Sequence, residues 1–172
     1  RHSHEFNIQL EGFSFDMAGA RNRKDSIVST LTKGVEKLLE SNGVQRIAGQ
    51  ATVLDPHAVK VNGELIKAQN LLLATGSVPA SLPIPGVDLP GVLSSDEILD
   101  LDKVPPRLTV VGGGVVGLEF ACIFNSFGSK VEVFEYLPYL LNKLDNELAR
   151  RILVFLKRQG IKVHTATRVE RI

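Results

Sequence analysis

Cysteine, methionine and tryptophan are almost missing from this sequence. Its 172 residues include one cysteine, one methionine and no tryptophan, and only 6% are aromatic. A single cysteine, Cys122, excludes an internal disulfide. We expect Cys122 to be a packed thiol rather than a reactive one, because Phe120, Ala121 and Ile123 are its neighbours on a predicted helix.

Neither sign of charge is in excess, and no long apolar run is present. Twenty lysines and arginines against 19 aspartates and glutamates give a net charge of +1. No basic stripe suggests nucleic acid. The longest apolar stretch, Thr109 to Phe124, contains four glycines and Glu119, so it is not a membrane span. No signal peptide or lipidation motif is evident. We therefore expect neither a nucleic-acid partner nor a membrane partner.

The length suffices for one or two domains with a sizeable core. A hydrophobic content of 44% and a charged content of 23% are typical of a globular protein. The chain begins with Arg1, which favours a fragment, a processed product or an incomplete chain. His2 and His4 are spaced like a metal pair, but an unstructured start is the favoured interpretation, and we expect no metal site.

The most informative segment runs from Leu108 to Glu119, where an apolar strand leads through a glycine-rich turn into a helix. Gly112 permits the tight turn, Gly114 lets a pyrophosphate approach the bare backbone, and Gly117 lets the helix pack closely on the strand. The helix N-terminus adds free N–H groups and a partial positive charge. Gly-x-Gly-x-x-Gly alone is a weak signal, but apolar strands flank it here on both sides. The segment predicts a dinucleotide site.

An acidic residue completes this pattern. The next predicted strand, 130–134, is followed by Glu135, which lies 18 residues past Gly117 (135 − 117). A carboxylate there can accept hydrogen bonds from an adenosine ribose and would repel a 2′-phosphate, so we predict NAD rather than NADP. The alternative, a turn that only packs, does not explain why the glycines and the acid fall in register.

Before the glycine turn, the sequence predicts a helix and a small antiparallel meander. Apolar residues recur every three or four positions from about Arg23 to Ser41, which indicates an amphipathic helix. Asn62-Gly63 is a strong hairpin signal, because type I′ turns need positive φ at both central residues. Short strands are expected at 44–48, 51–54, 58–61 and 64–67.

The rest of the chain predicts a buried strand, a connector and a nucleotide-binding half. Asn70 to Ala74 is a continuous apolar run of the buried parallel type. Val78 to Pro90 holds four of the eight prolines and is interpreted as an extended connector. Ser94 to Glu97 has the pattern of a capping box, and Asp145 that of a helix N-cap. The predicted elements beyond are strand 107–111, helix 114–127, strand 130–134, helix 145–159 and strand 161–165.

Together these motifs resemble the dihydrolipoyl dehydrogenases, in class I of the pyridine nucleotide–disulfide oxidoreductase family. The resemblance runs from about Arg23 to Ile172, in the family's order and spacing. It rests on Ala74-Thr-Gly-Ser77, the proline-rich link, Ser94-Ser-Asp96, Val104-Pro-Pro-Arg-Leu108, the glycine segment to Glu119, Gly128 to Glu135, and Asp145 to Ile161. It implies an α/β fold of the FAD/NAD-linked reductase type. Residues 1–104 would be a partial FAD-binding domain with the meander and a linker, and 105–172 the Rossmann-like βαβαβ first half of an NAD-binding domain.

The resemblance implies two cofactors, FAD and NAD, and positions that contact each. Those implied for NAD are Gly112, Gly113, Gly114, Val115, Val116, Gly117, Leu118, Glu119, Glu135 and Val169. Those implied for FAD are Ala51, Thr75, Gly76 and Ser77. Ala51 would approach the FAD adenine, Val169 the NAD adenine and Glu119 the nicotinamide. The alternatives are ordinary strand packing for Ala51 and Val169, a plain turn for 75–77, and a favourable place in the helix macrodipole for Glu119.

The departures from the family pattern concern catalysis. The family's reaction passes electrons from dihydrolipoamide to a Cys-x4-Cys disulfide, then to flavin and then to NAD. This chain lacks a second cysteine, the first FAD glycine motif and the C-terminal His–Glu pair. His57 is interpreted as turn surface and His164 as a strand residue. We assign no catalytic residue and expect an internal fragment of a dihydrolipoyl dehydrogenase that is inactive alone, since the cofactors carry the chemistry.

The resemblance also implies partners and a location. The parent would be a homodimer in the bacterial cytoplasm or the mitochondrial matrix. It would act on a lipoyl-bearing protein of a 2-oxoacid dehydrogenase or glycine cleavage complex. The nearest alternative is a sibling flavoenzyme, such as a glutathione or mercuric reductase or an NADH oxidase, and Glu135 disfavours those that use NADP. Another alternative is a non-catalytic nucleotide-binding fragment.

Overall fold

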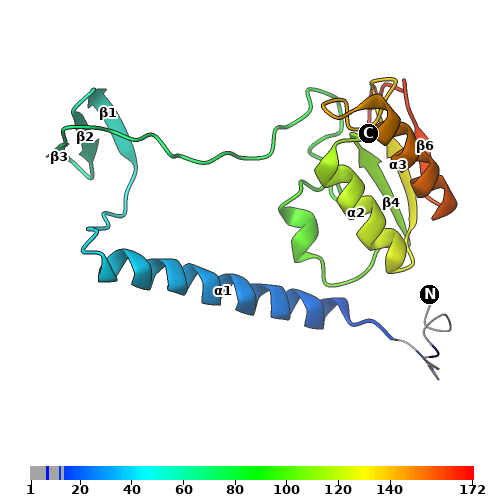
Figure 1. Cartoon of the computed structure of the whole chain (residues 1–172), viewed down its shortest axis with the longest axis horizontal. Coiled ribbons are helices and arrows are strands. Elements are labelled where there is room, and N and C mark those ends of the chain that lie inside the picture. Colours follow the sequence, from blue (N-terminus) through cyan, green and yellow to red (C-terminus); the bar gives the residue numbers. More distant parts are fainter. Residues whose placement is uncertain (1–6, 8–11, 13) are drawn as a thin grey trace. The chain divides into compact units, whose positions relative to one another are not determined.

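The structure is a computed structural model that describes residues 7, 12 and 14–172, so His2 and His4 lie outside the described residues. The chain divides into two compact units (Figure 1). One is Lys24–Val78, and the other is Pro79–Ile172 together with the described residues up to Arg23. Each unit has its own sheet of three strands.

The predicted amphipathic helix is present as α1 (Met17–Ser41), which begins six residues before the predicted start at Arg23 (23 − 17). Tertiary contacts account for the extra residues: Met17 packs against an apolar core, and Arg21 forms an ion pair with Asp102 at 2.6 Å. The predicted apolar stripe is not covered in the structure, since no residue of α1 is buried and Leu31 is 65% exposed.

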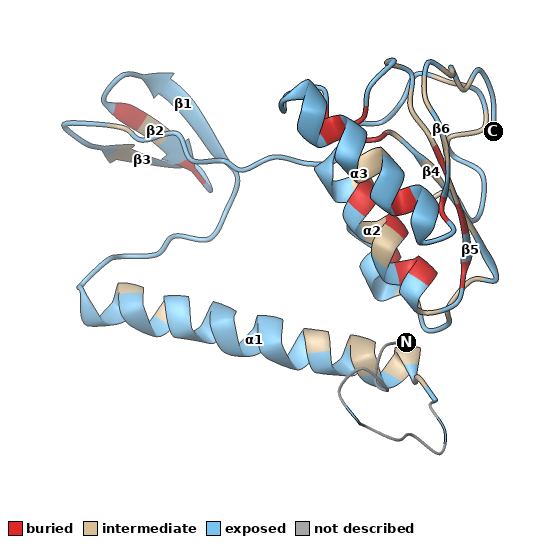
Figure 2. Ribbon diagram, turned by 45° about the vertical axis from the view of Figure 1, so that its right-hand side comes forward, coloured by how far each residue is buried: buried red, intermediate tan, exposed pale blue. Residues whose placement is uncertain are grey.

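The unit Lys24–Val78 contains the predicted antiparallel meander. Strands β1 (Ala51–Asp55), β2 (Ala58–Val61) and β3 (Glu64–Lys67) pair in that order. The hairpin prediction is confirmed, because Asn62 and Gly63 have φ of 51° and 89° and Val61 pairs with Glu64. Ala58 and Val61 are the buried residues of this meander (Figure 2).

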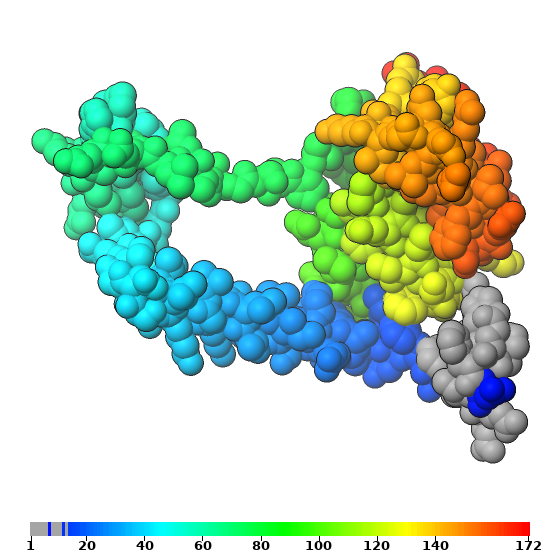
Figure 3. All heavy atoms as spheres, in the orientation of Figure 1, coloured from blue at the N-terminus to red at the C-terminus, as the bar shows by residue number. Residues whose placement is uncertain are grey.

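Two of the strands predicted in this unit, at 44–48 and 70–74, are not present in the structure. Residues 44–48 are irregular, because the N–H of Val44 donates to Leu39 at the end of α1 and the Ala48 carbonyl accepts from the Asn62 side chain. Residues 70–74 form no strand either, and Leu72 is 91% exposed. A parallel strand needs a neighbour to satisfy its N–H and C=O groups. No described strand pairs with this run. In Figure 3 the green segment that follows the meander appears as a narrow strip of spheres.

The other unit is built on a parallel sheet, as predicted. Strands β4 (Arg107–Val111), β5 (Lys130–Phe134) and β6 (Lys162–His164) lie in the order β4-β5-β6. Arg107 pairs with Lys130, and Glu132 with Lys162. Helices α2 (Val115–Ser126) and α3 (Asn146–Arg158) connect the strands. The predicted βαβαβ half is therefore confirmed, with element ends shifted by at most one residue.

The apolar core lies between this sheet and its helices. Val131 and Val133, two residues apart on β5, are buried on the same face, and Phe124 and Leu156 pack there from α2 and α3 (Figure 2). The buried residues of this core cluster are Ile98, Leu118, Ala121, Phe124, Val131, Val133, Leu140, Leu141, Leu156 and Ile161.

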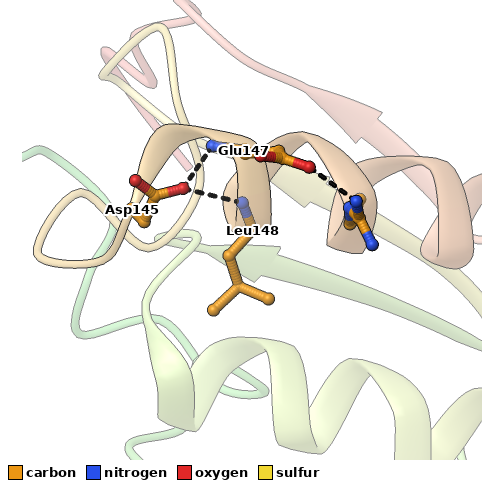
Figure 4. Close-up of polar contacts among 4 residues, drawn as sticks. Asp145, Glu147 and Leu148 are labelled. Carbon is orange, nitrogen blue, oxygen red and sulfur yellow. Dashed lines mark hydrogen bonds and ion pairs between the residues drawn. The ribbon is translucent and has the colours of Figure 1, made fainter.

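Two predicted capping motifs have the expected hydrogen bonds. Ser94 and Glu97 bond reciprocally at 2.7 and 3.3 Å and open a short 3-10 helix, η2 (Glu97–Asp100). The Asp145 carboxylate accepts from the N–H groups of Glu147 and Leu148 at 2.8 and 3.3 Å (Figure 4). The domain boundary at 104 stays a prediction.

Candidate nucleotide-binding site

The glycine turn begins where β4 ends. Gly112 has φ of +108°, a conformation that side-chain-bearing residues rarely adopt. Its N–H donates to the Phe134 carbonyl at 2.8 Å, which continues the pairing of β4 with β5 by one residue. The chain can therefore leave the sheet sharply and enter α2, as the sequence predicts for this glycine.

Gly113 is buried, and the spacing of the motif gives no reason for a glycine at this position. The NAD contact that the resemblance implies for Gly113 stays a prediction. Its N–H donates to Glu135 Oε2 at 2.6 Å, and its carbonyl accepts from the Leu141 N–H at 3.0 Å. A Cβ added here would overlap Leu140 Cδ2 and lie 3.1 Å from Glu135 Oε2. Gly113 is thus fixed by the loop that follows β5.

Gly114 is open on the side where Gly113 is closed. A Cβ added to Gly114 would meet no atom within 4 Å. Gly114 is the N-cap of α2, and no side chain caps the helix there. The N–H groups of the first turn have no acceptor within a helix, so they and the helix macrodipole favour an anion at this position. The space and the donors fit a diphosphate.

Gly117 has the close contact predicted for the third glycine. A Cβ added to it would lie 2.5 Å from the Gly112 carbonyl oxygen and 3.1 Å from Val110 Cγ1. Any larger residue would push α2 away from β4. The three glycines of the motif therefore have three different environments: a turn, an open face and a packing contact.

The carboxylate of Glu135 lies beside the glycine turn. Its Oε2 accepts from Gly113, and its Oε1 accepts from the Leu137 N–H at 2.7 Å. Glu135 is half-buried. Each carboxylate oxygen has two lone pairs, so each retains acceptor capacity for a hydroxyl group. The acid therefore both supports the turn and keeps a negative charge next to it.

The remaining residues of the glycine segment differ in exposure. Val115 and Val116 are exposed in the first turn of α2, and Glu119 is exposed one turn further along. Leu118 points into the core, with 6% of its surface exposed, and its N–H donates to the Gly114 carbonyl. Their contacts with a nucleotide remain predictions.

The segment after β6 runs alongside Glu135. The Thr167 N–H donates to the Glu135 carbonyl at 2.9 Å, and the Ala166 N–H donates to Leu137 at 2.9 Å. Val169 follows two residues later and is half-buried. Val169 is predicted to lie near the adenine. The segment that carries it contacts Glu135, which is predicted to bind the adenosine ribose.

The residues predicted to contact FAD lie in the unit Lys24–Val78. Ala51 is the first residue of β1 and is exposed. Thr75, Gly76 and Ser77 lie in the extended, exposed segment after the meander, and Gly76 has φ of +72°. Their contacts with FAD are predictions.

The other reactive side chains have structural surroundings. Cys122 is half-buried against the core, and burial raises the pKa of its thiol, so little of it is thiolate at neutral pH. His57 is exposed in a turn, with Nδ1 2.8 Å from the Gln69 carbonyl oxygen. His164 lies on β6 and stacks on Phe134 with ring centroids 4.6 Å apart. Within the described part of the chain, no group of three or more His, Cys, Asp or Glu could hold a metal ion.

No helix in the described ranges is long and apolar enough to cross a membrane.

Comparison with known proteins gives the family. Residues 3–172 match the family model described as "Pyridine nucleotide-disulphide oxidoreductase". The chain belongs to this family. The resemblance stated from the sequence motifs is therefore confirmed, as is the α/β fold of the FAD/NAD-linked reductase type.

Individual relatives agree with this assignment. A dihydrolipoyl dehydrogenase of Acholeplasma laidlawii is 38% identical over 99% of this chain and 52% of its own length. One of Bacillus subtilis is 34% identical over the whole chain and 39% of its own length. The chain thus spans about half, or less, of the curated relatives it matches.

Solved structures show the same fold. The HOCl-induced flavoprotein disulfide reductase RclA from Escherichia coli superposes with a TM-score of 0.82 at 34% identity, over 92% of this chain and 37% of its own. A ferredoxin reductase from Rhodopseudomonas palustris gives a TM-score of 0.71 at 26% identity over 80% of this chain. The family description names a pyridine nucleotide and the RclA title a flavoprotein, which supports the cofactor classes expected from the sequence.

Proposed function

We propose that this chain provides the NAD-binding surface and part of the FAD-binding surface of a flavin-dependent dihydrolipoyl dehydrogenase. The overall reaction is dihydrolipoamide + NAD⁺ → lipoamide + NADH + H⁺. Two electrons and two protons leave the dithiol, one hydride reaches the nicotinamide, and one proton is released. The names of the relatives from Acholeplasma laidlawii and Bacillus subtilis support this substrate class.

The contrast between Gly113 and Gly114 carries the NAD assignment. Gly113 is enclosed, whereas Gly114 borders open space at the uncapped N-terminus of α2. The diphosphate of NAD would rest on that backbone, where first-turn N–H groups bind it. Val115, Val116, Gly117 and Leu118 would frame this contact, and Glu119 would lie toward the nicotinamide.

Glu135 would select NAD over NADP. Its carboxylate already accepts from two backbone N–H groups, so its orientation is fixed before a ligand arrives. The remaining lone pairs would accept from the ribose hydroxyls, and its charge would repel a 2′-phosphate. Val169 would contact the adenine through its backbone, on the segment that Thr167 joins to Glu135.

The FAD contacts would come from the other unit. The backbone of Ala51 would approach the FAD adenine, and Thr75, Gly76 and Ser77 would form the turn that passes beside the flavin nucleotide. When bound, FAD would relay electrons between the substrate dithiol and NAD. We place the boundary between the two nucleotide-binding parts near residue 104.

We assign no catalytic residue within this chain and propose that the isolated polypeptide does not turn over. A dithiol–disulfide couple needs two cysteines, and the sequence contains one. Its role is to bind and orient the cofactors. The active enzyme would act on a lipoyl-bearing protein as a homodimer, in a bacterial cytoplasm or, as the name of the Schizosaccharomyces pombe relative states for that protein, in mitochondria.

The second candidate is a sibling flavoprotein disulfide reductase, which the likeness to RclA favours, or an NADH oxidase. A non-catalytic nucleotide-binding fragment is a third. Purification of the native protein, with its intact mass and flavin absorption spectrum, separates the fragment from an enzyme. NADH formation from dihydrolipoamide supports the first candidate, whereas NADH-dependent reduction of another disulfide supports the second.

The NAD assignment is tested by titrating the chain with NADH and NADPH. We expect NADH to bind about tenfold more tightly or better, the size of a charge-dependent preference worth roughly 1.4 kcal/mol. Glu135→Gln should reduce this preference, because the amide oxygen can still accept from one N–H group but carries no charge. Equal binding of both nucleotides, or no binding of NADH, contradicts the assignment.

A further inference from the structure

We propose that Leu140 and Leu141 are positioning residues for the nucleotide turn. They lie in the loop after β5 and hold Gly113 from the core side, so that Gly114 and the first turn of α2 remain open to a diphosphate. This inference rests on the proposed binding of NAD at the turn. Nothing in the glycine pattern itself points to these two leucines.

The contacts enclose Gly113 on three sides. Leu140 is 2% exposed, and its Cδ2 fills the space that a side chain at Gly113 would need. The Leu141 N–H donates to the Gly113 carbonyl at 3.0 Å. The Gly113 N–H is bound by Glu135 at 2.6 Å. Both backbone polar groups of the middle glycine therefore have hydrogen-bond partners in the segment 135–141, which fixes their orientation.

The backbone of Leu141 adopts a rare conformation to make this contact. Its φ is +51°, in the left-handed region that residues with a branched or bulky side chain seldom occupy. Such a conformation persists only where the surrounding structure holds it, and it occurs preferentially at functional sites. Here its side chain is 9% exposed within the core, while its N–H points to the turn.

The loop is itself anchored, so it can resist displacement. The Leu137 N–H donates to Glu135 Oε1, the Ala166 N–H donates to the Leu137 carbonyl, and the Leu144 N–H donates to the Leu141 carbonyl. Leu140 and Leu141 belong to the same core cluster as Leu156. The position of the turn is thus coupled to the packing of the whole unit.

The test compares Leu140→Ala with a matched control, Leu156→Ala. Leu156 is 1% exposed in the same cluster, but it lies on α3. Both changes remove equal apolar volume from a buried site, so both should lower the midpoint of thermal unfolding. NADH affinity of the 172-residue chain is then measured well below both midpoints. We expect Leu140→Ala to weaken binding about tenfold, the size of coupling between contacting residues, and Leu156→Ala to leave it within about twofold.

A reciprocal substitution tests the same contact from the other side. Gly113→Ala should weaken NADH binding, because its methyl group overlaps Leu140. The double variant Gly113→Ala/Leu140→Ala should bind more tightly than the product of the two single losses predicts. Where the alanine variants do not fold, Leu140→Val and Leu156→Val make the same comparison with a smaller cavity.

The outcomes separate this inference from the proposed function. If the unaltered chain does not bind NADH, the proposed function fails and this inference fails with it. If the unaltered chain binds NADH but the Leu140 and Leu156 variants bind it equally well, only the positioning role of the loop is overturned. Strictly multiplicative losses in the double variant also overturn it.

Discussion

The two units of this chain use the same kinds of residue to different effect. In Pro79–Ile172, the apolar residues of β5, α2 and α3 form a core in which Phe124 is 2% exposed. In Lys24–Val78, Leu72 and Val78 are 91% and 86% exposed, whereas Leu156 and Val133 of the other unit are 1% and 0% exposed. Composition therefore does not decide burial here; the presence of a partner surface does.

This difference shows which kind of structure each unit can hold alone. In the meander, each strand forms hydrogen bonds with the strand next to it in the sequence, so the sheet forms although few of its residues are buried. The run 70–74 would need a strand from elsewhere, and none of the described strands pairs with it. Elements with local partners persist in both units, whereas elements with distant partners persist only in the second.

The largest expected contrast is in amide hydrogen exchange. Core amides open only with free energies up to the global stability, whereas unpaired exposed backbone exchanges almost freely. We expect amides of 70–78 to exchange on the order of a thousandfold faster than those of Val131 and Val133, given a stability of about 5 kcal/mol or more. Mass spectrometry after timed exchange, with proteolysis, measures both segments in one sample.

The internal reference for that experiment is the meander, whose paired amides should fall between these extremes. Protection of 70–78 equal to that of β5 would mean that the segment has a partner in solution. The comparison of the two units would then no longer hold.

A core substitution should also separate the units. Phe124→Ala removes a fully buried ring and should lower the free energy of unfolding of the second unit by about 3–5 kcal/mol. Phe155→Ala is the matched control, since Phe155 is 54% exposed, and it should cost about 0.5 kcal/mol or less. Denaturant unfolding followed by near-ultraviolet circular dichroism measures both. Similar losses for the two variants would show that Phe124 is not in a formed core.

Local sequence signals predicted most of the fold. Asn62-Gly63, Ser94 with Glu97, and Asp145 were placed correctly, because each depends on hydrogen bonds within a few residues. The start of α1 was predicted six residues too late, because Met17 and Arg21 make contacts with residues far along the chain. The prediction of a strand at 70–74 was wrong because a buried parallel strand needs a neighbouring strand, and no described strand pairs with this run.

In the candidate site as well, some residue roles follow from local sequence signals and others depend on distant contacts. The different environments of Gly112, Gly114 and Gly117 agree with the roles that their spacing predicts. The role of Gly113 could not be predicted, because it depends on Leu140, which is 27 residues away (140 − 113) and has no fixed spacing in the motif. The sequence shows only that Leu140 and Leu141 lie between Pro138 and Asn142; their burial is known from the structure.

A smaller effect is expected at the N-terminus of α3. Asp145→Ala removes the side-chain acceptor for the N–H groups of Glu147 and Leu148 and should cost about 1 kcal/mol (Figure 4). Asp145→Asn keeps an oxygen acceptor and is the control. Thermal unfolding of the second unit measures both variants. An Asn variant as unstable as the Ala variant would show that charge, and not the cap, matters there.

The smallest expected effect is the pH dependence of the capping box before β4. Hydrogen bonds from Ser94, first from its backbone N–H and then from its side chain, lower the pKa of Glu97. A carboxylate whose pKa is lower in the folded state stabilises the fold above its unfolded pKa, and this contribution is lost as pH falls through the folded value. Acidification below about pH 4, the ordinary range of glutamate, should therefore lower the unfolding midpoint slightly more in the unaltered chain than in Glu97→Gln, whose amide can cap but does not titrate. Parallel acid profiles for the two proteins would show that this exposed carboxylate does not contribute to the stability of the unit.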